Sequence, residues 1–247
     1  MLETRNLTIR FGGHVAVDRV SCAFAPGTLT AIVGPNGAGK TTYFNLISGQ
    51  LRASAGQVLL GGDDITAEPA SARTHRGLGR AFQLTQLFPN LTVLENVRLA
   101  VQSRRREGLN LWSVWLDRRD TLERARALVQ QVQLGDRAEA IASSLPHGDQ
   151  RKLEVAMLMA LDPQVFMFDE PTAGMSVDEV PVILDLIRTL KARRDATILL
   201  VEHKMDVVRE LADRIIVLHN GQLVADGEPA EVIASPVVQQ AYLGVAA

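Results

Sequence analysis

The segment GPNGAGKTT, residues 34–42, constrains this 247-residue chain more than any other feature. Gly34, Gly39, Lys40 and Thr41 match the pattern G-x-x-x-x-G-K-[ST], and they lie between an apolar run, LTAIV, and a helix-like run, TTYFNLISG. In that setting the glycines permit a tight turn, and the loop amides and the helix N-terminus face phosphate oxygens. Lys40 is expected to reach the β and γ phosphates, and Thr41 to bind Mg²⁺. The segment therefore predicts a strand, loop and helix that hold a nucleotide by its phosphates.

The bulk composition sets limits on the rest of the chain. Its length suits one large α/β domain with a sizeable core, or two small ones, and we favour a single domain. The net charge of -2 gives no general attraction to nucleic acid or acidic lipid, so phosphate binding must be local. The single cysteine, Cys22, excludes an internal disulfide framework and a cysteine metal site, and it is expected to be a small buried residue in a reducing compartment.

No segment has the character of a signal peptide or a membrane span. The N-terminus, MLETRNLTIRF, is charged and alternating. The longest apolar runs, such as VFMF at 165–168 and ATILLV at 196–201, fall far short of the roughly 18 residues that a spanning helix needs. We expect a soluble chain, which a partner must hold if it works at a membrane.

The strand-like segments predict a mainly parallel sheet covered by helices. LTAIVG, VFMFDE (165–170) and ATILLVEH (196–203) read as buried parallel strands, and RIIVLHNGQLVADG reads as a hairpin with its turn at NG. The opening stretches ETRNLTIRF and HVAVDRVSCAFAPGTL alternate instead, which favours half-exposed antiparallel strands.

A helical segment interrupts this pattern. We predict a nucleotide-binding core over 1–90 and 162–227, an inserted helical subdomain over 91–161, and a C-terminal helical segment over 228–247 in which PAEVIASPVVQQAYLG forms one short amphipathic helix. Within the insert, Trp112 and Trp115 lie among arginines. A nucleic-acid patch is one interpretation, but we favour a solvated loop followed by a helix that packs the tryptophans against its own subdomain.

Four further polar residues are candidates for the same site, and three of them follow strand ends that are expected to face the phosphate loop. Asp169 and Glu170 close one strand: Asp169 suits Mg²⁺ held through water, and Glu170 suits the orientation and deprotonation of the attacking water. His203 closes the next strand, where its imidazole could contact the γ phosphate and that water. Gln83, between core and insert, could touch Mg²⁺. The alternatives are that Asp169 and Glu170 form a solvated acidic turn and that His203 is structural. Both are less favoured, because these residues follow strands whose ends are expected to point at one site.

Five segments occur in the order and spacing of the ABC-transporter ATPase domain, which the chain resembles over essentially its whole length: GPNGAGKTT, FQ followed by LTVLENV, LPHGDQRKLEVAMLMALDP, FMFDEPTAG and LLVEH. Within that family it is most similar to ATPases of branched-chain amino acid importers and their urea-importer relatives, on IRFGGHVAVDRVS, DEPTAGMSVDE and VVQQAYLG. The resemblance implies an α/β P-loop NTPase fold with a mainly parallel core sheet, an antiparallel β subdomain and an inserted helical subdomain.

The resemblance also implies roles for individual residues. Residues 34–42 would be the Walker A loop, Gln83 the Q-loop residue facing a permease, Asp169 and Glu170 the Walker B pair, and His203 the switch histidine. Phe11 stands where the family stacks an aromatic ring on adenine. The expected catalytic residues are Lys40, Glu170 and His203; the expected Mg²⁺ ligands are Thr41, Gln83 and Asp169; and the expected ATP-binding residues are Phe11, Gly34, Pro35, Asn36, Gly37, Ala38, Gly39, Lys40, Thr41, Thr42, Gln83 and, across a dimer, Gly148.

The signature motif departs from the family's L-S-G-G-Q. The chain has Leu145, Pro146, His147, Gly148 and Asp149 there, so a residue without an amide hydrogen replaces the serine. Gly148 keeps the backbone donor that the family places near the γ phosphate. A carboxylate at position 149 suits a helix N-terminus, but we expect it to repel a nearby triphosphate.

A second departure is Ser176, which stands at the aspartate position of the family's D-loop. Both departures lie in elements that reach across the dimer, whereas the chain's own phosphate-handling residues are intact. We therefore hypothesise that the chain pairs with a different ATPase, that its signature weakens the partner's ATP site, and that its own site hydrolyses ATP.

The expected function is the ATP-hydrolysing, Mg²⁺-dependent motor of an importer for branched-chain amino acids or related amino acids and amides. The expected partners are a second ATPase subunit, permease subunits and an extracytoplasmic binding protein, with no nucleic acid, at the cytoplasmic face of the inner membrane. The alternatives are a lipid or glycolipid exporter, a soluble ABC ATPase acting on nucleic acid or ribosomes, and a clamp that binds ATP without hydrolysing it. The cargo rests on the family resemblance alone.

Overall fold

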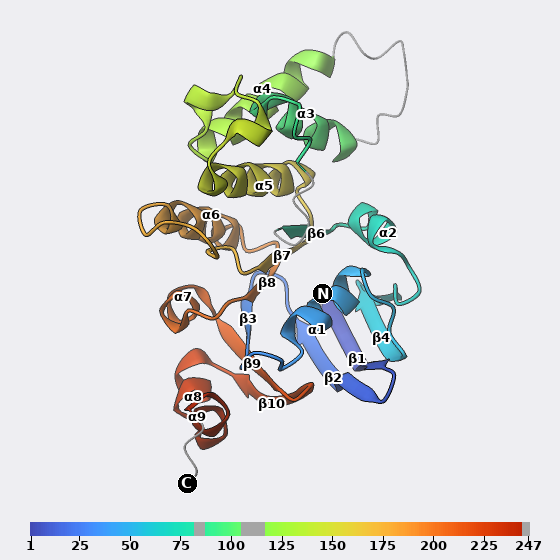
Figure 1. Ribbon diagram of the computed structural model, residues 1–247. Helices are drawn as coiled ribbons and strands as arrows, with labels where there is room; N and C mark the ends of the chain where they lie inside the picture. Colours follow the sequence, from blue (N-terminus) through green and yellow to red (C-terminus); the bar gives the residue numbers. More distant parts are fainter. Residues whose placement is uncertain (82–86, 105–116, 244–247) are drawn as a thin grey trace. The chain divides into compact units, whose positions relative to one another are not determined.

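The computed structural model describes residues 1–81, 87–104 and 117–243 and divides into two compact units (Figure 1). The first unit comprises Met1–Leu78, Gln164–Glu170 and Ile187–Ala247, and the second comprises Gly79–Pro163 and Pro171–Leu186. The chain thus passes between the units four times, so each unit is assembled from segments far apart in the sequence.

The first unit is built on a sheet with the strand order β10-β9-β3-β8-β7. Its strands are β3 (Leu29–Val33), β7 (Val165–Asp169), β8 (Thr197–Val201), β9 (Arg214–His219) and β10 (Gln222–Gly227). β3 pairs in parallel with both β8 and β9, and β7 pairs in parallel with β8. Every residue of β3, β7 and β8 is buried, which explains why these strands read as continuous apolar runs. The three predicted parallel strands are confirmed.

The predicted hairpin is also confirmed, because β9 and β10 pair antiparallel. Asn220 and Gly221 form its turn with φ angles of 48° and 76°. Two successive left-handed residues are what the tightest hairpin turn requires, and Asn-Gly adopts that conformation at the least cost.

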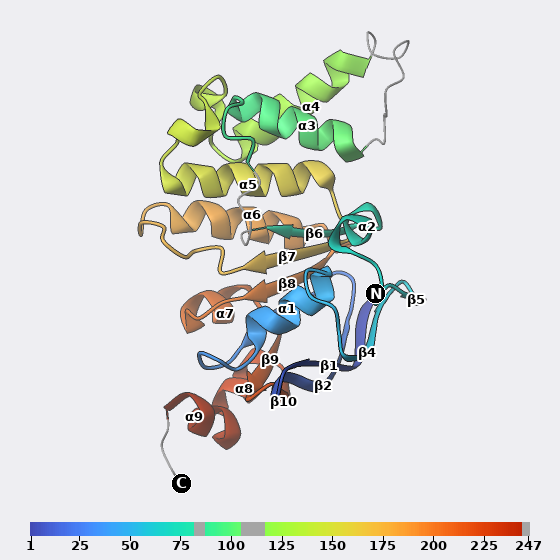
Figure 2. The same cartoon turned by 45° about the vertical axis from the view of Figure 1, so that its right-hand side comes forward.

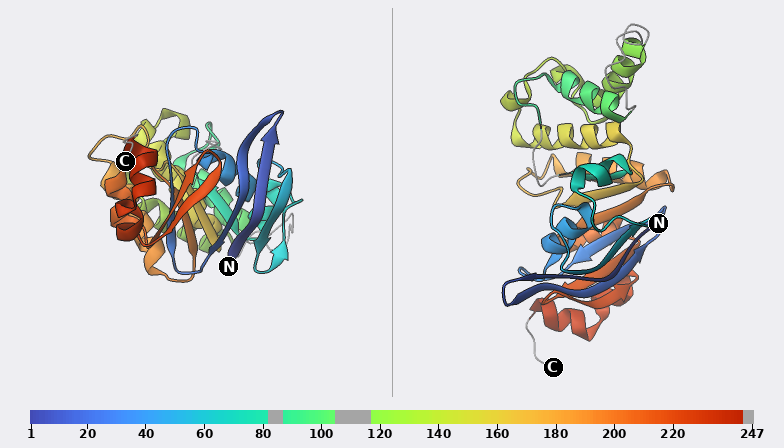
Figure 3. Two further views of the ribbon diagram at one scale, coloured as in Figure 1. Left: turned by 90° about the horizontal axis from the view of Figure 1, so that it is seen from below. Right: turned by 90° about the vertical axis from the view of Figure 1, so that its right-hand side faces the viewer.

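A second, antiparallel sheet has the order β2-β1-β4-β5. Its strands are β1 (Leu2–Phe11), β2 (His14–Phe24), β4 (Ala55–Leu60) and β5 (Asp63–Asp64). Figure 3 shows β1 and β2 as long neighbouring strands. Their pairing is irregular at several points, and Asn6 and Arg19 adopt positive φ angles of 47° and 50° there. The antiparallel reading of the N-terminal stretch is confirmed.

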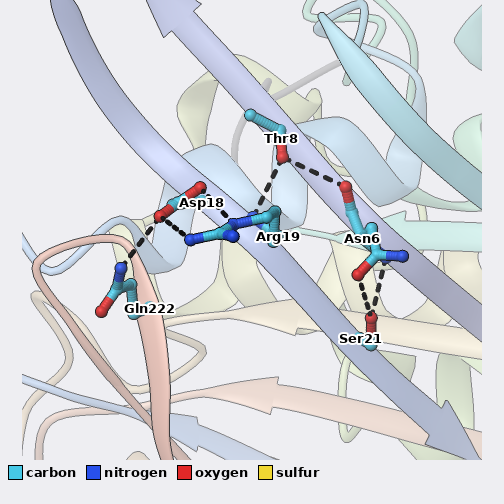
Figure 4. A network of polar contacts seen from close by, with 6 residues as sticks. All are labelled: Asn6, Thr8, Asp18, Arg19, Ser21 and Gln222. Carbon is cyan, nitrogen blue, oxygen red and sulfur yellow. Dashed lines mark hydrogen bonds and ion pairs between the residues drawn. The ribbon is translucent and has the colours of Figure 1, made fainter.

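A polar network runs along these irregular strands and reaches the hairpin (Figure 4). Gln222 Nε2 donates to Asp18 Oδ2 at 2.9 Å, and the Asp18 N–H donates to the Gly221 carbonyl at 2.8 Å. Hydrogen bonds from Gln222 and then from Arg19 lower the pKa of Asp18. The network therefore ties β2 to the turn between β9 and β10, within the first unit.

Helix α1 (Lys40–Ser48) contributes to the core that both sheets share. Figure 2 shows α1 alongside strands of both sheets. Its buried Phe44 packs in one cluster with Leu7 of β1 and Ile32 of β3. Tyr43 shares a 2.7 Å hydrogen bond with the Thr4 hydroxyl, which in turn accepts the backbone N–H of the buried Cys22. Buried contacts with both sheets thus hold the phosphate-loop helix α1 in place.

The C-terminal segment was predicted as one helix, and that prediction is wrong. Within that segment the structure has two short helices, α8 (Pro229–Ala234) and α9 (Pro236–Leu243), whereas α7 (Met205–Leu211) comes earlier, between β8 and β9. Ser235 is extended, with φ -69° and ψ 136°, between α8 and α9. Pro236 disfavours the helical conformation in the residue before it, so the amphipathic run breaks at that point.

The second unit is mainly helical, as predicted. Helix α3 (Val93–Arg104) packs against α5 (His147–Leu161) and α4 (Asp117–Gln131), and 3-10 turns lie at Gly135–Arg137 and Ala142–Ser144. Along β6 (Leu78–Ala81) and α6 (Val180–Ala192) the chain passes between the units, and α2 (Ala70–His75) precedes β6 in the first unit. The subdomain boundaries at 91 and 161 stay a prediction. Trp112 and Trp115 lie outside the described residues.

No helix in the described ranges is both long enough and apolar enough to span a bilayer.

Candidate functional site

The phosphate-loop segment follows β3 and leads directly into α1, as its sequence predicts. Gly34 and Gly39 have φ angles of 151° and 97°. A Cβ on Gly34 would lie 2.1 Å from the Leu218 carbonyl oxygen, and one on Gly39 would lie 2.4 Å from the Ala16 carbonyl oxygen. Both obstructing atoms belong to the backbone, which cannot move aside as the end of a flexible side chain can. These two glycines are therefore required by close packing of the loop, whatever they do for a ligand.

Gly37, at the tip of the loop, differs from the other two glycines. Its φ is 79°, but a Cβ there would meet nothing within 4 Å. Asn36 and Gly37 are both exposed, while Ala38 is buried and its N–H donates to the Pro35 carbonyl at 3.2 Å. The loop therefore combines an anchored base with an open tip, which fits the approach of a phosphate chain to its backbone.

Lys40, the first residue of α1, folds back across the loop. Its Nζ donates to the carbonyls of Gly34 at 2.7 Å and Pro35 at 3.0 Å, and the residue is 6% exposed. Burial lowers the pKa of Lys40, whereas the charges of Glu170 and Asp169 oppose that shift. A cation thus lies inside the loop, with the predicted carboxylate pair close enough to act on it.

The carboxyl ends of β7 and β8 bring the predicted catalytic pair together. Asp169 is buried and pairs in register with Val201 of β8. Glu170 follows with a φ of 51°, and its N–H donates to the Val201 carbonyl at 2.9 Å. Glu170 Oε1 and His203 Nε2 are 2.8 Å apart, with about 40% of each side chain exposed. The carboxylate and the imidazole therefore form one hydrogen-bonded unit that solvent can reach.

Glu202 takes part in this turn, although sequence reasoning gave it no role. It is 3% exposed, and its Oε2 accepts the backbone N–H groups of His203 at 2.9 Å and Lys204 at 3.3 Å. Two amides on one buried carboxylate fix the backbone that carries the imidazole. The signal in the sequence is a charged residue directly after the four apolar residues ILLV, because burying such a charge is costly unless it is hydrogen-bonded.

The predicted Mg²⁺ ligands are one hydroxyl, one carboxylate and one amide. Thr41 is half-buried in the first turn of α1, Asp169 is buried at the end of β7, and Gln83 lies outside the described residues. Among the described residues, no three His, Cys, Asp or Glu side chains gather as a metal cluster. A sparse oxygen set suits Mg²⁺, which takes one or two protein ligands and completes its shell with phosphate and water.

The adenine-stacking candidate stands at the end of β1. Phe11 is 50% exposed and pairs with His14 across the turn between β1 and β2. Its ring is thus accessible at the end of β1, as a stacking residue must be.

The signature segment lies in the second unit, at the start of α5. Pro146 is extended and precedes the helix, which begins at His147. Asp149 is 7% exposed, and its two oxygens pair with Arg137 Nη1 at 2.6 Å and Lys152 Nζ at 2.8 Å. The expectation that Asp149 repels a triphosphate treated this carboxylate as an unpaired charge. Two cations compensate it, so its charge alone gives no reason for repulsion.

A different carboxylate lies over the signature glycine. A Cβ on Gly148 would be 2.0 Å from Glu179 Oε1, so the Glu179 carboxylate rests directly against this backbone. Ser176 holds the same side chain, because its N–H and hydroxyl donate to Glu179 Oε2 at 3.0 Å and 2.9 Å. Glu179, which sequence reasoning did not identify, thus connects Ser176 with Gly148, the signature glycine that the chain retains.

Comparison with known proteins identifies the family of this chain. The ABC transporter family model matches residues 17–173, and the model described as branched-chain amino acid ATP-binding cassette transporter matches residues 222–247. LivG of Escherichia coli K12, a high-affinity branched-chain amino acid transport ATP-binding protein, is 37% identical and covers 100% of this chain and 98% of its own length. BraF of Pseudomonas aeruginosa, described likewise, is 35% identical over 100% of this chain and 98% of its own.

Solved structures show the same fold. The ADP conformation of MJ1267, an ATP-binding cassette of an ABC transporter, superposes with a TM-score of 0.83 at 30% identity over 99% of both chains. A nucleotide-free ATP-binding cassette from an ABC transporter gives 0.84, also at 30% identity and 99% coverage. The chain therefore belongs to the ABC transporter family of ATP-binding proteins, which bind and hydrolyse ATP on this fold. Within that family it is of the branched-chain amino acid type.

Proposed function

We propose that this chain is the ATP-hydrolysing subunit of an importer that takes up branched-chain amino acids or related amino acids and amides. The observation that carries the ATPase part is the 2.8 Å contact between Glu170 and His203, in the unit that also holds the phosphate loop. The cargo class is supported by the match of residues 222–247 and by the descriptions of the relatives.

Each site residue has a defined task in this proposal. Residues 34–42 bind the phosphates of ATP, and Phe11 stacks on the adenine. Thr41, Gln83 and Asp169 hold Mg²⁺, which when bound offsets the phosphate charge. Glu170 takes a proton from the attacking water, and His203 fixes the Glu170 carboxylate and contacts the γ phosphate.

The proposed assembly places the subunit on the cytoplasmic face of the inner membrane as a peripheral protein. A second ATPase subunit faces it, so that Gly148 completes the partner's ATP site. Permease subunits receive the movement through the segment around Gln83, an extracytoplasmic binding protein delivers the cargo, and no nucleic acid takes part.

We further propose that the two ATP sites of the assembly are unequal. Two features support this: Pro146 lacks the serine hydroxyl of the consensus, and the Glu179 carboxylate, which would repel a phosphate, rests against Gly148. The partner's site would then be weak and this chain's own site hydrolytic. Replacing Glu170 by Gln, compared with the equivalent change in the partner subunit, tests the asymmetry: equal loss of transport from both would count against it.

The decisive experiment for the function is copurification. A tagged copy is isolated from detergent-solubilised membranes of its own cells, and the proteins that come with it are identified by mass spectrometry. A second ATPase, two permease subunits and a binding protein support the importer. Recovery of itself alone, of ribosomes or of lipid-export components would overturn the transport role, and a purified protein without ATPase activity would indicate a clamp.

A further inference from the structure

A buried arginine outside the predicted site holds the far end of helix α1. Arg73, in α2, is only 2% exposed. Its Nη1 donates to the carbonyls of Leu46 and Ile47, both at 2.7 Å, in the last turn of α1. Its Nη2 donates to the Thr66 carbonyl at 2.8 Å, and its Nε donates to the Glu68 carbonyl at 3.0 Å. One guanidinium thus joins the end of the phosphate-loop helix to the chain that precedes α2.

These bonds complete the end of the helix. The last carbonyls of any helix have no partner within it. Backbone N–H groups after α1 close on the Asn45 carbonyl at 2.9 and 3.1 Å, but the Gly49 N–H lies 3.4 Å from the Leu46 carbonyl. Arg73 supplies the short bonds at Leu46 and Ile47. Its positive charge also complements the negative end of the helix dipole.

Gly49, at the end of α1, packs closely against Arg73, and we call this contact between α1 and Arg73 the joint. Gly49 has a φ of 80°, and a Cβ there would lie 2.8 Å from Arg73 Nε and 3.0 Å from the Ala70 nitrogen. Burial lowers the pKa of Arg73, while the charges of Glu68 and Asp64 oppose the shift. A guanidinium stays charged in proteins, so the joint keeps its cation.

We propose that Arg73 is a positioning residue for nucleotide binding: by clamping the last turn of α1 it fixes the first turn, which carries Lys40 and Thr41. The helix has only nine residues and is therefore about 13 Å long, so it moves as one rod. A tilt at the clamped end is carried to the phosphate-binding end. The inference rests on ATP binding at the phosphate loop and not on the transported cargo.

The test is Arg73→Met, with Arg76→Met as the matched control. Arg76 lies three residues on, with 43% of its side chain exposed, and pairs with Glu68 and Asp63 instead of with α1. We expect Arg73→Met to raise the KM for ATP about tenfold while kcat changes less than about twofold. The reason is that the residues of α1, Lys40 included, bind the phosphates in the ground state and the transition state alike. Glu170 and His203, which act on the attacking water, instead follow β7 and β8. Arg76→Met should leave both constants unchanged.

Two further variants keep the test decisive if Arg73→Met does not fold. Arg73→Lys keeps the charge but loses the fork that reaches four carbonyls, and Gly49→Ala disturbs the same joint without changing charge. Both should raise the Kd for a fluorescent ATP analogue and speed amide exchange in residues 44–48. A purely structural cap would lower Tm and leave KM and Kd at wild-type values, and that result in the folded variants would overturn the proposal. A wild-type protein that binds the analogue without hydrolysing ATP would refute the proposed function, while the Kd comparison would still test Arg73.

Discussion

The contact between Glu170 and His203 predicts that the two residues act as one unit in hydrolysis. The proposed pair shares a single hydrogen bond of 2.8 Å, and each side chain is about 40% exposed. Glu170→Gln keeps the volume and removes the base. A general base contributes roughly 10²–10⁴-fold, so we expect a loss of about 3–5 kcal/mol in transition-state stabilisation.

His203→Ala should cost a similar amount, because the Glu170 carboxylate then loses the group that orients it. The double variant should be much less impaired than the product of the two single losses predicts. Residues in direct contact typically show interaction energies of about 1–3 kcal/mol, so the double variant should hydrolyse ATP roughly 5–150-fold faster than additivity allows.

The assay is steady-state phosphate release by the purified complex at saturating ATP. Binding of a fluorescent ATP analogue is the control, and its Kd should stay within about twofold of wild type in Glu170→Gln, since Glu170 acts on the attacking water and lies outside the phosphate loop. Any loss of the proposed His203 contact with the γ phosphate raises the Kd of the other two variants, and saturating ATP keeps that effect out of kcat. Strictly multiplicative losses in kcat would refute the reasoning, because they would show that the two side chains act independently.

Three more predictions concern the loop, the signature segment and a buried carboxylate. Gly34→Ala should destabilise the protein by about 1–3 kcal/mol and weaken ATP binding, because its Cβ would lie 2.1 Å from the Leu218 carbonyl oxygen. Gly37→Ala should cost less, because a Cβ there meets no atom within 4 Å. Equal Tm shifts in the two variants would contradict this. Arg137→Met should cost about 1 kcal/mol in urea unfolding because it removes one of the two cations paired with Asp149, and the loss should vanish in an Asp149→Asn background. Burial raises the pKa of Glu154 above its usual 4.5 despite its pairing with Arg151. The folded state therefore holds this proton more tightly than the unfolded state. Wild type should lose stability relative to Glu154→Gln as the pH rises from 4.5 through the folded pKa, as measured by urea unfolding across pH. A wild-type protein that gains stability relative to Glu154→Gln over that range would contradict the prediction.

The fold was predictable where one local signal decides it. Continuous apolar runs gave β3, β7 and β8 because each is buried on both faces, and Asn-Gly placed the turn of the hairpin. The C-terminal helix was predicted wrongly because amphipathic spacing continues through Pro236, whereas the backbone does not.

The sequence identifies those residues of the candidate site that belong to the phosphate-loop motif or directly follow an apolar strand. The pairs that complete it join residues without any fixed spacing: Arg137 with Asp149, Glu179 with Gly148, and Arg73 with the end of α1. Periodicity cannot report such contacts, because the intervening chain sets them. For that reason Asp149 looked like an unpaired charge in the sequence.

The burial of Cys22 makes the natural chain suitable for site-specific labelling. It is the only cysteine, it is 6% exposed, and burial raises the pKa of its thiol to about 11. At pH 7 roughly one thiol in ten thousand is then in the reactive thiolate form. A cysteine introduced at Val177, which is 87% exposed, would therefore take a maleimide dye or spin label selectively in the folded protein. Spectroscopic distance measurements can begin from the wild-type sequence, with no need to replace Cys22.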